Sequence, residues 1–276
     1  MYTLSHLYRK PAIALCFAAA FVSIPTARAQ VGLGLTPMRE ELALPAGGQH
    51  SGVLTLVNDS QAKVRIVGEL LDFYIDASTT PQFGPEWPQE ADFSCRKWLV
   101  MNPMEIELEA HAQTLVRYTV RTPAGVPTRS YHCAMGFTTQ PTASEVRGTG
   151  LRTAVQIVSA LYVIVGKPAV EGSLKDLKAE YVSDAKTQGW RAVVVMANPG
   201  EMHYRPSGDL DVLDESGAVV ESAKFASIPV LPRRDQNFIF PLKLAAGPGH
   251  YTLRARVDLG GSEIQEASAR VTVPKP

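Results

Sequence analysis

The chain has 276 residues, of which 45% are apolar and 20% charged, with 27 basic and 27 acidic side chains. This composition is typical of a globular protein and excludes a collagen-like or an acidic disordered chain. Because there is no basic excess, the composition argues against a protein that binds nucleic acid by neutralising phosphates.

Residues 1–29 have the layout of a secretory signal peptide. Arg9 and Lys10 form a basic start, residues 12–24 are apolar, and Ala27-Arg28-Ala29 makes a small-x-small cleavage site before Gln30. Neither this stretch nor any later one is long enough to span a membrane, so we expect no membrane span in the mature chain. Removal of residues 1–29 leaves 24 basic and 27 acidic side chains, which makes the mature protein mildly acidic.

Beyond the signal peptide the sequence predicts an all-β protein. Apolar residues recur mostly at every second position, and Gly, Pro, Asn and Asp interrupt them at short intervals, with no long helical stretch. Residues 77–91, which carry Phe83 and Trp87, are rich in Thr, Pro, Gly and Glu and are predicted as an excursion loop. The strands predicted in the first half are residues 52–58, 64–74, 106–108, 114–120, 131–137 and 153–165.

A second series of strands follows the turn near Gly166-Lys167-Pro168. In each half, a Pro/Gly turn leads into a strand that carries a tyrosine, Tyr131 or Tyr251, as at the tyrosine corner of β-sandwiches. About seven short strands in roughly a hundred residues is typical of an immunoglobulin-like sandwich. We therefore predict two tandem immunoglobulin-like β-sandwich domains, residues 30–166 and 167–276. The strands predicted in the second half are residues 191–197, 208–213, 218–221, 237–240, 249–257 and 269–273.

The sequence carries no catalytic signature. There is no P-loop, no Gly-x-Ser-x-Gly turn and no His-Glu-x-x-His motif. The acidic residues are scattered, and the histidines do not fall at metal-ligand spacings. We therefore expect no enzyme, no metal and no cofactor, and a hydrolase is the least favoured alternative. The mature histidines are His50, His111, His132, His203 and His250.

Cys95 and Cys133 are the cysteines of the mature chain. A signal peptide delivers them to an oxidising compartment, which favours a structural disulfide between them over two free buried thiols. The absence of a Cys-x-x-Cys motif argues against a redox pair.

The predicted strand 153–165 is apolar at nearly every position, whereas a half-exposed strand is apolar at every second one. Such a strand needs cover on both faces, so it is either a central core strand or one covered at the interdomain junction, or else an edge strand that another chain covers. Because an exposed apolar edge promotes aggregation, the second interpretation implies a partner that pairs with it. One face of the strand carries Val155, Ile157, Ser159, Leu161, Val163 and Val165.

The first half also resembles a known family, the periplasmic pilus-assembly chaperones, or PapD-like proteins. The resemblance covers about residues 31–168. It is carried by residues 35–39 (LTPMR), 54–58 (LTLVN), 98–103 (WLVMNP), 116–120 (VRYTV), 155–157 (VQI) and 167–168 (KP).

This resemblance implies a periplasmic chaperone with two immunoglobulin-like domains, whose last strand of the first domain complements an incomplete pilin sandwich. Arg39 would bind the terminal carboxylate of the pilin-like or other secreted subunit, since a guanidinium matches a carboxylate bidentately. The donated side chains would be Val155, Ile157, Leu161 and Val163, and an outer-membrane usher is a further partner that the resemblance allows. The family's second basic anchor, a lysine within the donor strand, has no counterpart in residues 160–163.

Two alternatives remain at this point. Arg39 is equally consistent with a solvated charge on a first strand. The whole protein is also consistent with a non-enzymatic structural or adhesion module of the cell envelope that binds another protein or a glycan through its sandwich loops. In that case the loop 77–91, with Phe83 and Trp87, would matter more than Arg39.

Overall fold

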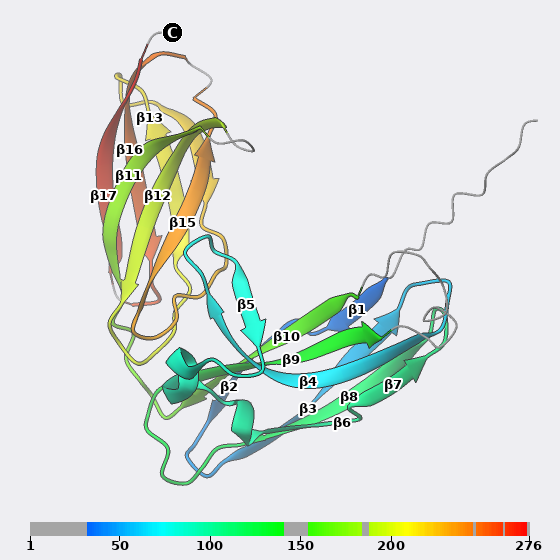
Figure 1. Ribbon diagram of the computed structural model, residues 1–276. Helices are drawn as coiled ribbons and strands as arrows, with labels where there is room; N and C mark the ends of the chain where they lie inside the picture. The colour runs from blue at the N-terminus through cyan, green and yellow to red at the C-terminus, as the bar shows by residue number, and fades with distance from the viewer. Residues whose placement is uncertain (1–31, 141–153, 184–187, 245–246, 262, 275–276) are drawn as a thin grey trace, which may run out of the picture. The chain divides into compact units, whose positions relative to one another are not determined.

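The computed structural model describes residues 32–140, 154–183, 188–244, 247–261 and 263–274 (Figure 1). Residues 31–276 form one compact unit. The predicted signal peptide, residues 1–29, lies outside the described residues. Within the described ranges, no helix has the length and apolar character needed to cross a membrane.

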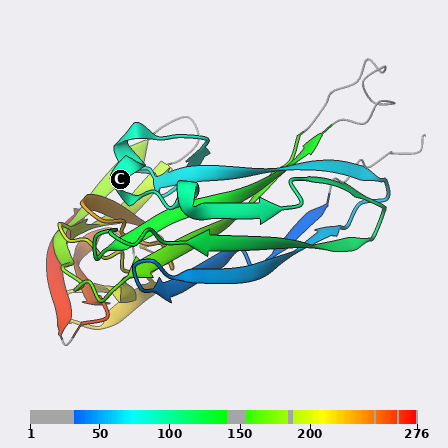
Figure 2. The ribbon, with the colours of Figure 1, turned by 90° about the horizontal axis from the view of Figure 1, so that it is seen from below.

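The first sandwich consists of two sheets, whose strands Figures 1 and 2 show from two directions. One sheet has the order β1-β3-β8-β6 and the other β2-β10-β9-β4-β5, with β7 paired to β4. Two short 3₁₀ helices, Pro88–Phe93 and Arg96–Trp98, lie between β5 and β6. The strands are β1 (Leu33–Thr36), β2 (Arg39–Leu44), β3 (Gln49–Asn58), β4 (Val64–Ile75), β5 (Pro81–Gly84), β6 (Leu99–Asn102), β7 (Glu105–Leu108), β8 (Gln113–Arg121), β9 (Ser130–Gln140) and β10 (Gln156–Val165).

The start of the chain contributes to both sheets. β1 pairs antiparallel with β3, whereas β2 pairs in parallel with β10. The β2 ladder covers β10 from Ala160 to Val165, and β9 pairs with β10 on the other side from Gln156 to Ile164. Among the described residues, no strand pairs with Gln156–Ser159 on the side where β2 ends.

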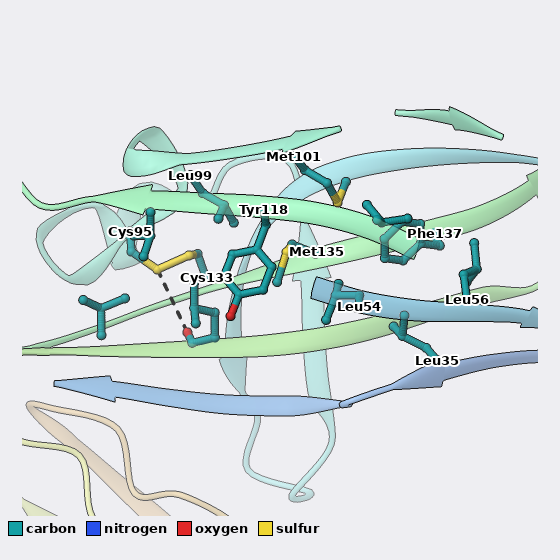
Figure 3. Close-up of a cluster of buried hydrophobic side chains, with 14 of the residues drawn as sticks. Leu35, Leu54, Leu56, Cys95, Leu99, Met101, Tyr118, Cys133, Met135 and Phe137 are labelled. Carbon is teal, nitrogen blue, oxygen red and sulfur yellow. Dashed lines mark hydrogen bonds between the residues drawn. A yellow bond between two sulfur atoms is a disulfide. The ribbon is translucent and has the colours of Figure 1, made fainter. Parts of the chain in front are cut away.

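Alternating side chains from the two sheets form the core of the first sandwich. Leu54 and Leu56 of β3 alternate with exposed or half-exposed neighbours, as a strand with one face in a core requires. Cys95 and Cys133 are fully buried in this core and form a disulfide, which confirms the predicted pair. Figure 3 shows the disulfide toward one end of the cluster and Phe137 toward the other.

The second sandwich has its own core, in which Met196, Leu210 and Leu253 are fully buried. Its sheets have the orders β11-β12-β15 and β14-β13-β16-β17. The predicted all-β class with two immunoglobulin-like sandwiches is therefore confirmed. The strands are β11 (Ser173–Ser183), β12 (Gln188–Asn198), β13 (Ser207–Leu213), β14 (Val219–Lys224), β15 (Arg234–Leu242), β16 (Gly249–Asp258) and β17 (Ile264–Val273).

The same local hydrogen bonds recur in both sandwiches. The Tyr131 hydroxyl donates to the Pro127 carbonyl at 3.0 Å, and the Tyr251 hydroxyl donates to the Gly247 carbonyl at 2.7 Å, so both predicted tyrosine corners are confirmed. Since a buried hydroxyl needs a partner, each bond fixes the turn that precedes its strand.

The structure adds five strands to those predicted: β1, β2, β5, β6 and β11. The segment predicted as an excursion loop, residues 77–91, contains β5, which pairs with β4 and places Phe83 5.5 Å from Phe73 between ring centroids. In addition, β1, β2, β6 and β11 were not among the predicted strands. β1 and β6 have four residues each, and β2 and β11 carry many charged side chains, so tertiary pairing decides their structure more than local pattern does.

We expect the disulfide to stabilise the first sandwich by restricting its unfolded state. Its cysteines are 38 residues apart, and a loop of this size contributes about 3 to 4 kcal/mol in the chain-entropy treatment. The double variant Cys95→Ala/Cys133→Ala should lose about this much unfolding free energy in urea titrations. Unchanged stability would contradict a structural role for the bridge.

Candidate functional site

The residues predicted to bind a partner divide into two groups along β10. Leu161 and Val163 are fully buried and pack in the core of the first sandwich. In this structure a partner could reach these two side chains only if the sandwich opened, so their role as donated side chains stays a prediction. Their part of β10 is also paired on both sides, with β9 and with β2.

Val155, directly before β10, and Ile157, the second residue of the strand, lie differently. Both are partly buried, and Ile157 packs against the margin of the first core. Val155 N donates to Thr139 Oγ1 at 3.0 Å, and the Val155 carbonyl accepts from Thr139 N at 2.9 Å, so β9 holds the backbone from one side. On the other side the β2 pairing begins only at Ala160, whose N–H donates to the Met38 carbonyl at 3.0 Å. Residues 156–159 therefore present a strand edge that no described strand covers.

Arg39 lies beside the point where this free edge ends. The parallel register places Arg39 opposite Ala160 and Glu41 opposite Tyr162. Paired residues project from the same face of a sheet, so these four side chains share the face opposite to Leu161. Arg39 is exposed, donates from Nη1 to Ser227 Oγ at 3.3 Å, and has no carboxylate partner among the described residues.

The loop between β12 and β13 brings two further side chains, His203 and Arg205, to this face. Asn198, which is buried, shapes the loop by donating from Nδ2 to the carbonyls of Met202 and Val230. The loop is attached to the start of β9, because His203 N donates to Ser130 Oγ at 2.8 Å. The Ser130 N–H in turn donates to the carbonyl of Glu201 at 2.9 Å.

Arg39, Glu41, Tyr162, His203 and Arg205 form one group, here called the Tyr162 cluster. The Tyr162 ring lies 4.6 Å from the His203 ring between centroids, and the Arg205 guanidinium lies 4.6 Å from the Tyr162 centroid. Arg205 also forms an ion pair with Glu41, and His203 Nε2 is 3.7 Å from Glu41 Oε2. The Arg205 guanidinium is thus restrained twice, by the aromatic face of Tyr162 that it covers and by the carboxylate of Glu41.

Burial and charge set the protonation of the cluster. Burial raises the pKa of Tyr162 to about 12. Burial also lowers the pKa of His203, against the opposing effect of Glu41. Contact with His203, together with the charges of Arg205 and Arg39, lowers the pKa of Glu41. Near neutral pH the cluster thus holds two guanidinium charges and one carboxylate, a net positive charge of one.

The cluster forms the polar margin of an apolar contact between the two sandwiches. Tyr162, Leu71 and Phe73 of the first sandwich pack with Leu231 of the second. The buried Glu90 also contacts His132 at 3.2 Å and forms an ion pair with Arg234. Two ion pairs, Glu41 with Arg205 and Glu90 with Arg234, therefore join a first-sandwich carboxylate to a second-sandwich arginine.

The geometry is suited to binding an anion. Two arginines with a single carboxylate between them leave guanidinium donors for a further carboxylate, which a guanidinium binds through parallel hydrogen bonds. Among the described residues, no group of three or more His, Cys, Asp or Glu side chains could hold a metal ion.

Sequence reasoning identified Arg39 but missed Arg205 and His203. Both follow β12 in a loop more than 160 residues from Arg39, and no motif in either segment refers to the other. The sequence offered one signal. Residues 160–163 contain no basic side chain, so a cation that accompanies Arg39 has to come from outside this strand.

No known protein-family model matches the sequence, and no curated protein matches it. Solved structures with a similar fold include the class 5 fimbriae chaperone CfaA, which is 16% identical over 88% of this chain and 100% of that chain, with a TM-score of 0.43. The E. coli chaperone DraB is 17% identical over 86% of this chain and 98% of its own, with a TM-score of 0.41. A chain from the complex of the Salmonella enterica SafA pilin with the SafB chaperone is 16% identical over 87% and 97%, with a TM-score of 0.42.

We expect His203 to make folding sensitive to mild acid. Since its pKa is lowered in the folded protein, the unfolded chain takes up a proton first as the pH falls below about 6.5, and stability is lost in that direction. The variant His203→Gln should therefore show a smaller drop in Tm between pH 7 and pH 5.5 than the parent. His250→Gln, at an exposed position of β16, is the matched control, and equal slopes for all three proteins would contradict the expectation.

The two parts of β10 should also differ in their effect on stability. Leu161→Ala removes a fully buried side chain and should cost about 2 to 5 kcal/mol of unfolding free energy. Ile157→Ala, in the half-paired part, should cost clearly less. Denaturant titrations of the two variants test this, and equal losses would show that Ile157 is as deeply packed as Leu161.

Proposed function

We propose that this protein is a non-enzymatic periplasmic chaperone that binds pilus, fimbrial or related surface subunits by lending them the first part of β10. The observation that carries the proposal is the pairing of this strand. Its second part is held between β2 and β9, whereas the described strands pair with Gln156–Ser159 on one side only.

A free edge of this kind favours strand addition. The backbone groups on the open side need partners, and an incomplete sandwich needs a strand, so pairing satisfies both chains. Val155, directly before β10, and Ile157 lie on the same face here and would fill pockets of the client. Leu161 and Val163 have a different role in this proposal, because their burial fixes the strand and reduces the entropy lost when the client binds.

Arg39 supplies the second contact. It is exposed, lies beside Ala160 where the free edge ends, and has no carboxylate partner among the described residues. A client whose terminal segment pairs with residues 156–159 could place its terminal carboxylate there. The bidentate geometry of a guanidinium would then fix the register of the added strand.

Two further features support the proposal. A buried disulfide fits the oxidising compartment that a signal peptide implies. The aromatic residues of the 77–91 segment, on which an adhesion module would depend, face their own sandwich, since Trp87 lies against Tyr74 at 5.1 Å and Phe83 against Phe73. An outer-membrane usher as a second partner is part of the proposal and requires its own binding test.

The test is to isolate the tagged mature protein from the periplasm of its host and identify co-purifying chains by mass spectrometry. We expect a small β-rich secreted subunit, and we expect its loss in both Ile157→Asp and Arg39→Ala. Matched controls are Ile264→Asp, at an exposed position of β17, and Arg117→Ala, at an exposed position of β8.

Hydrogen exchange then locates the contact. Amides of residues 156 and 158 should exchange quickly in the free protein and slowly in the complex. A subunit that is retained by both Ile157→Asp and Arg39→Ala, or a complex that leaves these amides unprotected, would contradict strand donation.

A further inference from the structure

We infer that Glu41 is an intramolecular competitor for the client's terminal carboxylate: it occupies Arg205 in the free protein and gives up this arginine when the client binds. This inference rests on the proposed function and adds a second arginine, from the second sandwich, to the binding site. The observation that supports it is the position of Glu41. It lies between Arg39 and Arg205, on the same face of the β2-β10 pair.

The alternation of β2 places Arg39 and Glu41 on one face and Glu40 on the other. Glu40 accepts a hydrogen bond from the Tyr118 hydroxyl, which belongs to the first core, so it does not contribute to the Tyr162 cluster. Both Arg39 and Arg205 lie close enough to Glu41 to lower its pKa. A carboxylate placed in this region therefore meets both guanidiniums.

The two partners of the ion pair differ in mobility. Arg205 is held by the Tyr162 ring beneath it, and 15% of its side chain is exposed. Glu41 has 38% of its side chain exposed and can turn toward water. When a client carboxylate replaces Glu41 on Arg205, one carboxylate is exchanged for another and a hydrated Glu41 is released, so the exchange itself requires little free energy.

The exchange makes the site selective. In the free protein Arg205 is already paired with Glu41. A carboxylate that reaches only one guanidinium therefore gains little binding free energy. A client end that is aligned by the strand edge reaches Arg39 and Arg205 together. Glu41 thus weakens the capture of isolated carboxylates, such as those of Asp and Glu side chains, more than the capture of an aligned chain end.

The test uses N-acetylglycine, a small carboxylate, as the probe and its uncharged amide as the control, both titrated into the full mature chain at constant ionic strength. The readout is the NMR signals of the Arg39 and Arg205 Nε–H groups, assigned with Arg39→Gln and Arg205→Gln. We expect Glu41→Gln to bind the probe about two- to fivefold more tightly than the parent, the range that an exposed ion pair covers. Glu107→Gln, an exposed ion-paired carboxylate of the same sandwich, should leave the affinity unchanged.

A double-mutant cycle isolates the contact. If Glu41 acts through Arg205, Glu41→Gln should tighten binding less in an Arg205→Gln background than in the parent. Urea titrations of Glu41→Gln confirm that the variant is folded.

Each outcome separates the two proposals. Unchanged or weaker binding by Glu41→Gln, with loss of binding in Arg39→Gln, would overturn the competitor role and leave the carboxylate site intact. Binding that does not depend on Arg39 would overturn the carboxylate site of the proposed function itself. Failure of both the parent and Glu41→Gln to bind the probe would overturn the inference.

Discussion

The pairing of β10 is the constraint on which the rest of the structure depends. Its second part has a strand on each side and contributes Leu161 and Val163 to the core, so this part cannot move without opening the sandwich. In the part of the chain that the structure describes, its first part pairs with β9 alone. The division arises where the chain crosses from β1 in one sheet to β2 in the other, and the Ser159 hydroxyl donates to the Pro37 carbonyl at this crossing, at 2.8 Å. A short switch near the start of the chain thus determines which residues of a strand more than 110 residues later are free to bind.

Much of the fold follows from the sequence because its determinants are local. Period-two alternation identified most strands, and the positions of Tyr131 and Tyr251 identified both tyrosine corners. The disulfide was predicted because the signal peptide implies an oxidising compartment and the mature chain has two cysteines. β2 could not be identified in this way, because residues 39–44 alternate between half-buried and exposed side chains and include three charges. Its position comes from pairing with β10, which is a tertiary property.

The candidate site was predictable only where its determinants are local. A strand that is apolar at nearly every position allowed either a central strand or a partner-binding edge, and the structure shows that β10 has two differently paired parts. The sequence contains nothing that distinguishes Ile157 from Leu161, since both belong to the same alternating face. The distinction depends on where β2 stops. Arg205 was out of reach of sequence reasoning, because its approach to Tyr162 depends on the Asn198 turn and on the Ser130 contact.

The contact between the sandwiches explains why a binding site can include charges from both. Leu71, Phe73, Tyr162 and Leu231 form an apolar contact that holds the surrounding polar groups in place. Burial lowers the pKa of His203 and raises that of Tyr162, so these two aromatic neighbours of Arg205 are neutral near neutral pH and Glu41 is its carboxylate partner. The free protein therefore needs one carboxylate at this position to balance Arg205. In the proposed complex the client supplies that carboxylate, and the same arginine that helps to join the two sandwiches then also contacts the client.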